Sequence, residues 1–183
     1  MSGNRCTRGF GRLLLRLFGW DVEGRFPDEK KMVLVVAPHT SNWDFFIGIA
    51  CVWATGIRIS FMIKSDAFEG PASGVLKALG GLPIDRAAAH GVVEQMVAEF
   101  ERRDALVLAI TPEGTRKKVD SWKTGFYHIA ERAAAPILLV YFDYGRKVVG
   151  FGPVRQATGN IDENIDGMRD YFRQFEARNP ELA

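Results

Sequence analysis

The sequence predicts a single α/β domain with a mostly parallel central sheet flanked by helices, preceded by an N-terminal amphipathic helix. Two observations indicate this class: apolar segments rich in β-branched residues alternate with helical patterns, and no Ser/Gly linker interrupts them. With 183 residues, 47% of them hydrophobic, the chain is long enough for one substantial core. We therefore expect a basic amphipathic segment over residues 1–24 and one α/β domain over residues 25–183.

Each element is predicted from its hydrophobic period. Short apolar runs bounded by turn residues predict strands, and apolar residues three and four apart predict helices. The strands expected on this basis are 32–37, 59–63, 106–110 and 136–142, and the helices that alternate with them are 43–54, 75–79, 92–102 and 125–133. Gly145 marks a hairpin-like return into an antiparallel strand over residues 147–151. A charged amphipathic helix over residues 161–177 is expected to cover the domain.

The N-terminal segment from Arg8 to Trp20 combines a basic stripe with an apolar one. Arg5, Arg8, Arg12 and Arg16 are the only charged side chains in residues 1–20, and leucines and phenylalanines recur at helical spacing. Such a helix can lie in a membrane interface, held by anionic lipid and buried hydrocarbon, whereas the alternative is a helix packed on its own domain. The longest apolar stretch, residues 45–57, is shorter than the roughly twenty residues of a spanning helix. We expect a cytoplasmic protein bound peripherally to the inner face of the cell membrane.

Charge and cysteine content exclude several classes of function. The formal net charge of +2 is too balanced to indicate a nucleic-acid partner. Cys6 and Cys51 lie in unrelated contexts and form no metal-ligand pattern, so we expect two free thiols in a reducing compartment and no metal site.

His39 and Asp44 lie five residues apart, directly after the predicted strand 32–37. A single turn brings them together, and a carboxylate bonded to one ring nitrogen leaves the other free to take a proton from a hydroxyl. The substrate can supply that hydroxyl itself. The alternative is a capped turn with a hydrogen-bonded core histidine. Neither His90 nor His128 is followed by a carboxylate at this spacing, so His39 is the candidate base.

The segment 80–86 contains a glycine pair, a short apolar stretch and the dipeptide Asp85-Arg86. Arg86 can offer a planar guanidinium to a phosphate, although a surface turn with a local ion pair is the simpler explanation of this segment alone. Lys64 follows the predicted strand 59–63, and carboxyl ends of parallel strands meet at one sheet edge. We therefore expect it on the same side of the domain as His39.

The segment Thr111-Pro112-Glu113-Gly114-Thr115-Arg116 follows the predicted strand 106–110. Pro112 and Gly114 impose a sharp turn that is expected to aim Glu113 and Arg116 into the space beyond the sheet. Three lysines follow closely and make this loop positive, which favours an anionic ligand, with a solvated basic loop as the alternative.

Together these segments resemble the glycerolipid acyltransferases typified by 1-acylglycerol-3-phosphate (lysophosphatidic acid) acyltransferase. His39 and Asp44 match the HxxxxD motif of that family, residues 81–86 are similar to its second block, and residues 112–116 are similar to its PEGTR-type block. Residues 135–137 stand at the place of its fourth block.

The resemblance spans about residues 33–142 and implies transfer of a fatty acyl group from acyl-CoA or acyl carrier protein to the free hydroxyl of a lysophospholipid, with no cofactor. The simplest acceptor is 1-acylglycerol-3-phosphate, which gives phosphatidic acid. His39 is then the general base and Asp44 orients it, while Glu113 shapes the site by bonding backbone or an arginine. The implied substrate-binding residues are Lys64, Arg86, Glu113, Gly114, Thr115 and Arg116.

Three alternatives stay open at this stage: an acyltransferase for another lysolipid such as a lyso-ornithine lipid, a hydrolase, and a catalytically silent lipid-binding protein of the same fold. An apolar groove for the acyl chain is expected beside His39. Phe45, Phe46, Ile49 and Trp53 share a helical face there, although core packing is the simpler explanation for most of them.

Overall fold

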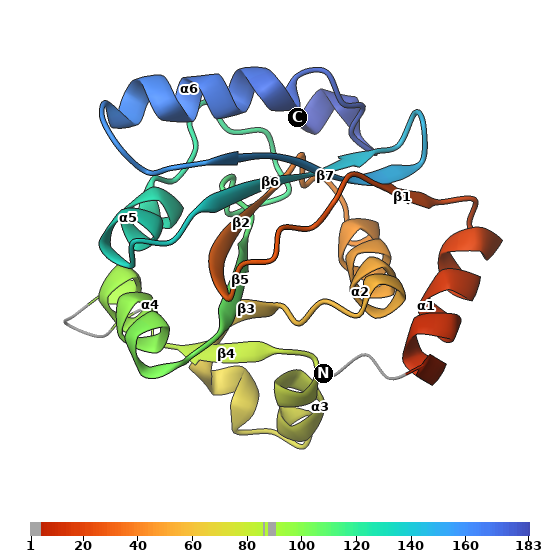
Figure 1. Cartoon of the computed structure of the whole chain (residues 1–183), viewed down its shortest axis with the longest axis horizontal. Coiled ribbons are helices and arrows are strands. Elements are labelled where there is room, and N and C mark those ends of the chain that lie inside the picture. Colours follow the sequence, from red (N-terminus) through yellow and green to blue (C-terminus); the bar gives the residue numbers. More distant parts are fainter. Residues whose placement is uncertain (1–4, 86, 88–90) are drawn as a thin grey trace.

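The computed structural model describes residues 5–85, 87 and 91–183, and the strands in this part of the chain form one seven-stranded sheet (Figure 1). The strand order is β1-β7-β6-β2-β5-β3-β4, and every neighbouring pair is parallel except the antiparallel pair β6/β7. The strands are β1 (Asp21–Glu23), β2 (Lys31–Ala37), β3 (Ser60–Lys64), β4 (Gly81–Ile84), β5 (Leu106–Ile110), β6 (Ile137–Asp143) and β7 (Val148–Arg155). The predicted α/β fold class is confirmed.

The helices are α1 (Arg5–Leu17), α2 (Trp43–Thr55), α3 (Ser73–Ala78), α4 (Gly91–Arg102), α5 (Gly125–Arg132) and α6 (Ile161–Phe172), with 3-10 turns η1 (Ser65–Phe68) and η2 (Pro180–Leu182). Two core clusters show how they are layered: side chains of α4, α5 and α6 pack on one face of the sheet, and those of α1 and α2 pack on the other (Figure 1). Because both faces are covered, the central strands β2 and β6 are buried along their length, which explains their continuous apolar runs.

Three elements differ from the sequence-based expectation. Residues 81–84, to which no strand was assigned from the sequence, form the edge strand β4, where Pro83 is tolerated because an edge strand has one unpaired side. The short strand β1 was not expected and pairs with β7. The C-terminal helix ends at Phe172 instead of residue 177, and the chain after it turns back towards the loop between β2 and α2.

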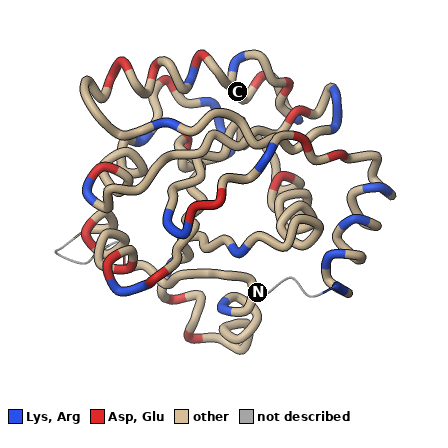
Figure 2. The backbone as a smooth tube through the Cα atoms, viewed as in Figure 1, with Lys and Arg blue, Asp and Glu red and all other residues tan. Residues whose placement is uncertain are grey.

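Helix α1 packs closely against α2. Gly11 is buried in this contact, and a Cβ atom built there would lie 2.4 Å from the backbone nitrogen of Ala54. Phe10 contacts the ring of Trp53 with 5.7 Å between centroids. The four arginines of α1 are exposed along the helix (Figure 2), and the Arg8 guanidinium lies next to Gly56 at the end of α2. None of the described helices combines the length and apolar composition that crossing a membrane requires.

Replacing Gly11 by alanine should lower the free energy of unfolding by about 2 kcal/mol, because the added methyl group meets α2 backbone that cannot move aside without separating the helices. Gly9→Ala is the matched control in the same helix, since a Cβ there meets nothing within 4 Å. It should raise the stability by about 0.5–1 kcal/mol through helix propensity. Equal stability changes for the two variants in urea denaturation would contradict this packing.

Candidate active site

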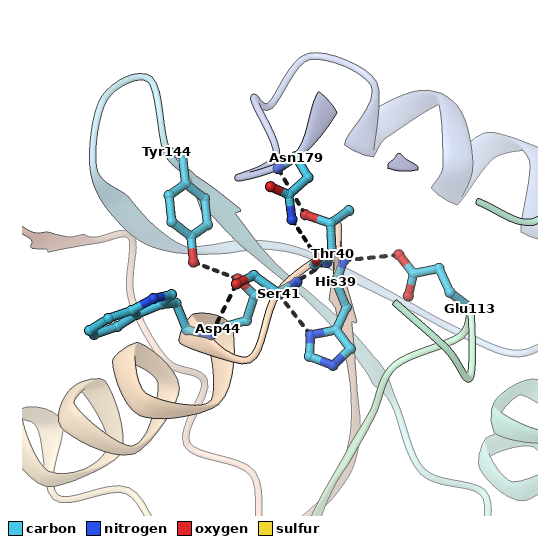
Figure 3. Close-up of polar contacts among 8 residues, drawn as sticks. His39, Thr40, Ser41, Asp44, Glu113, Tyr144 and Asn179 are labelled. Carbon is cyan, nitrogen blue, oxygen red and sulfur yellow. Dashed lines mark hydrogen bonds and ion pairs between the residues drawn. The ribbon is translucent and has the colours of Figure 1, made fainter. Parts of the chain in front are cut away.

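The turn between β2 and α2 is built around the side chain of Asp44. A cis peptide bond joins Ala37 to Pro38, and the chain then turns into α2. Asp44 Oδ2 accepts hydrogen bonds from the backbone N–H groups of Thr40 (3.1 Å) and Ser41 (2.9 Å) (Figure 3). The side chain of Asn42, the residue before the helix, makes no capping bond. Asp44 therefore holds the turn from inside the first turn of the helix, where a negative charge is also favoured by the helix dipole.

The same carboxylate oxygen contacts the imidazole of His39. The distance between His39 Nδ1 and Asp44 Oδ2 is 2.9 Å, and the Asp44 side chain is almost fully buried, with 1% exposed. Because a carboxylate only accepts, Nδ1 must carry the proton in this contact, and Nε2 then bears the lone pair. The predicted meeting of His39 and Asp44 is observed, and the contact suits the base role expected for His39.

Two contacts from distant parts of the chain complete this centre, and the sequence analysis missed both. The phenol of Tyr144, in the turn after β6, donates to Asp44 Oδ1 at 2.5 Å. Asn179, near the C-terminus, donates its side-chain amide to the Thr40 carbonyl at 2.8 Å and its backbone N–H to Thr40 Oγ1 at 3.2 Å. No spacing rule links residues 100 and 139 positions apart, so no local signal identified them.

Glu113 contacts the catalytic candidate through the backbone. Its Oε1 accepts from the His39 N–H at 3.2 Å, while Oε2 is buried without a hydrogen-bond partner in the structure. Burial raises the pKa of the Glu113 carboxyl, against the lowering effect of the His39 N–H. Gly114 follows with a positive φ of 64°, and the Gly114 N–H donates to the Thr111 carbonyl at 3.1 Å. This turn orients Glu113 towards His39 instead of into open space beyond the sheet.

A cavity of about 740 Å³ begins at His39 and Asp44 and is lined mainly by apolar side chains. It lies where the sheet separates: β3 pairs with β5 at only two positions, and Met62, Ile63 and Ile110, beyond those positions, line the cavity. The cavity therefore occupies the space that further pairing of these two strands would close.

The four α2 side chains that were expected to share one face, Phe45, Phe46, Ile49 and Trp53, do not all line the cavity. Phe45 and Ile49 line the cavity, as expected for a groove. Phe46 is exposed, and Trp53 contacts Phe10 of α1. Only part of that helical face therefore contributes to the groove.

The basic residues predicted to bind an anion are not gathered in one place. Arg116 and Lys123 line the cavity, together with Gly114. Lys64 lies at the end of β3 but makes an exposed ion pair with Asp66 at 2.5 Å and is not part of the cavity lining.

Two further predicted residues do not add to the lining. Thr115 is exposed, and its Oγ1 accepts from the Lys117 N–H at 3.3 Å. Arg86 lies outside the described residues. Within the described ranges, no group of three His, Cys, Asp or Glu side chains is arranged to hold a metal ion.

Comparisons with known proteins agree with this architecture. A family model described as Acyltransferase matches residues 21–143. The crystal structure of the 1-acyl-sn-glycerophosphate (LPA) acyltransferase PlsC from Thermotoga maritima is similar, with a TM-score of 0.63 and 17% sequence identity over 95% of this chain and 81% of that chain. This likeness supports the fold. No curated protein matches the sequence of the chain.

The raised pKa of Glu113 predicts a pH dependence of stability. The folded state binds this proton more tightly than the unfolded state, so the stability that the protonated form contributes is present at low pH and is lost as the pH rises above the ordinary value of 4.5. The glutamine of Glu113→Gln does not titrate, so this variant should not show the loss of stability that wild type shows as the pH rises from about 4.5 to neutrality. The free energy of unfolding of the variant, minus that of wild type, should therefore increase over this range. The exposed Glu101→Gln variant is the control. A difference that does not change with pH, measured by urea denaturation, would contradict the effect of burial.

Proposed function

The chain belongs to the acyltransferase family, and from that premise we propose that it is an O-acyltransferase of glycerophospholipids. It transfers a fatty acyl group from an acyl thioester, either acyl-CoA or acyl carrier protein, to the free hydroxyl of 1-acylglycerol-3-phosphate, and the product is phosphatidic acid. The observation that carries this proposal is the His39–Asp44 pair, which lines the same cavity as a long apolar surface and two cationic side chains.

The proposed reaction begins at His39 Nε2. This nitrogen takes the proton of the acceptor hydroxyl while the oxygen attacks the thioester carbon, and Asp44 stabilises the imidazolium that forms. The tetrahedral intermediate then expels the thiolate. The thiolate is protonated by His39 Nε2, which gives up the proton that it took from the acceptor hydroxyl. The C–O bond of the new ester replaces the C–S bond of the thioester, and the base returns to its starting state without an acyl-enzyme.

The acyl chain and the acceptor phosphate need different surroundings, and the cavity lining contains both apolar and cationic side chains. An acyl chain needs an apolar lining, which Phe45, Ile49 and Ile110 provide next to the base. A phosphate needs cations, and Arg116 and Lys123 line the same cavity. We assign the acceptor phosphate to these two residues and not to Lys64, because Lys64 is paired with Asp66 outside the lining.

The substrates are lipids, and we propose that the protein binds peripherally to an anionic membrane on the cytoplasmic side. Seven exposed apolar side chains on and beside α1 and α2 form what we call the α1–α2 apolar surface: Phe10, Leu13, Leu17, Phe18, Trp43, Phe45 and Phe46. Four of these side chains contact one another in series, since Phe18 contacts Trp43, Trp43 contacts Phe46 and Phe46 contacts Phe45. The exposed arginines of α1 lie along the same helix and would meet lipid phosphates (Figure 2).

The proposed chemistry predicts that His39→Ala loses acceptor-dependent thiol release from a long-chain acyl-CoA or acyl carrier protein by a factor of at least about a thousand, because no second histidine lines the cavity among the described residues. The assay uses purified protein with lysophosphatidic acid in lipid vesicles. His128→Ala, in the exposed part of α5, is the control and should keep wild-type activity. Thiol release by the wild type without acceptor would indicate a hydrolase, and no release with any lysolipid or donor would indicate a silent lipid-binding protein.

The proposed membrane contact predicts that the double variant Leu13→Glu, Leu17→Glu binds anionic vesicles about 100-fold more weakly than wild type in a sedimentation assay. Both side chains are more than half exposed, so the change removes buried hydrocarbon on the membrane without disturbing the core. Val75→Glu with Val154→Glu introduces the same charges at exposed apolar sites outside the α1–α2 apolar surface and should bind like wild type. Equal weakening in both double variants would point to net charge alone.

A further inference from the structure

Tyr144 is the first residue beyond the segment 21–143 that the family model matches, yet its phenol donates directly to the carboxylate that orients His39. We propose that Tyr144 is a positioning residue for acyl transfer: its O–H fixes the Asp44 carboxylate so that His39 Nε2 stays directed at the acceptor hydroxyl. The inference rests on the proposed function, because it assigns a role in that same reaction.

The two oxygens of Asp44 have separate partners, and this division shows what Tyr144 contributes. Oδ2 accepts from His39 Nδ1 and from the backbone N–H groups of Thr40 and Ser41. Oδ1 accepts from the Tyr144 phenol, and no other partner for it is found in the described part of the chain. A carboxylate held through one oxygen can rotate about its Cβ–Cγ bond, whereas bonds on both oxygens fix its plane. The plane of the carboxylate in turn determines the orientation of the imidazole.

The phenol is itself held from three directions. The Tyr144 ring meets the edge of Trp20 with 4.8 Å between centroids and an interplanar angle of 86°. The guanidinium carbon of Arg178 lies over the Tyr144 ring, 5.7 Å from its centroid. The Tyr144 backbone N–H donates to the Glu176 carbonyl at 2.8 Å. Because these contacts come from the segment after α1 and from the C-terminal segment, the hydroxyl is placed by packing and not by a flexible loop.

The protonation state suits a donor. Burial, followed by the hydrogen bond to Asp44, raises the pKa of the Tyr144 phenol. The hydroxyl therefore keeps its proton at neutral pH and donates to the ionised carboxylate. A hydrogen bond from a neutral donor to a charged acceptor in a buried site is among the stronger ones in proteins.

Tyr144→Phe tests the role, because it removes the hydroxyl and keeps the ring against Trp20 and Arg178. We expect kcat to fall about tenfold while the KM values for the lysolipid and the acyl donor change by less than about twofold, since Tyr144 is not part of the cavity lining. Tyr171→Phe on α6 is the matched control: it makes the same chemical change at a ring that packs against Phe172 and Phe175, and it should keep the wild-type kcat.

A double-mutant cycle with Asp44→Ala separates positioning from general stability. If Tyr144 acts through Asp44, adding Tyr144→Phe to Asp44→Ala should lower single-turnover rates by less than about twofold further. Additive losses, or an unchanged kcat in Tyr144→Phe, would overturn the positioning role. A wild type that transfers no acyl group would instead overturn the proposed function, so the two failures are distinguishable.

Discussion

The hydrogen bonds of the buried Asp44 carboxylate are the interaction on which the proposed catalytic centre depends. A carboxylate on a side chain that is 1% exposed is costly to bury unless hydrogen bonds replace its lost hydration. Asp44 has four donors, of which two belong to the turn after β2, one to His39 and one to Tyr144. One side chain thereby closes the turn, begins α2 and orients the base. The geometry of these three features cannot be changed independently.

The sheet determines where the substrates can go. Parallel strands bring the ends of β2, β3 and β5 to one edge, and the limited pairing between β3 and β5 leaves a cavity beside His39. Glu113 joins the loop after β5 to the loop after β2 through the His39 N–H. Its second oxygen is buried without a hydrogen-bond partner in the described part of the chain, which is a cost in stability beside the proposed base.

Local patterns predicted much of this arrangement, and long-range contacts account for what they did not. The strand and helix periods located most elements, and the meeting of His39 with Asp44 follows from a spacing within one turn. Lys64 also follows a strand, as expected. Its ammonium group forms an ion pair with Asp66, two residues away, and Lys64 is not part of the cavity lining. Tyr144 is 100 residues from Asp44 and carries no recognisable motif, so only the fold shows that the two side chains meet.

Phe45 connects the proposed chemistry to the proposed membrane contact. It is partly exposed on the α1–α2 apolar surface and also lines the cavity that begins at His39. A lysolipid and an acyl thioester both carry hydrocarbon whose exposure to water is costly, so a route bounded by apolar side chains from bilayer to base lowers that cost. Such a route requires α1 to stay fixed against α2, and the close approach at Gly11 provides this. In the proposed route, the small residue in the helix contact serves substrate delivery as well as stability.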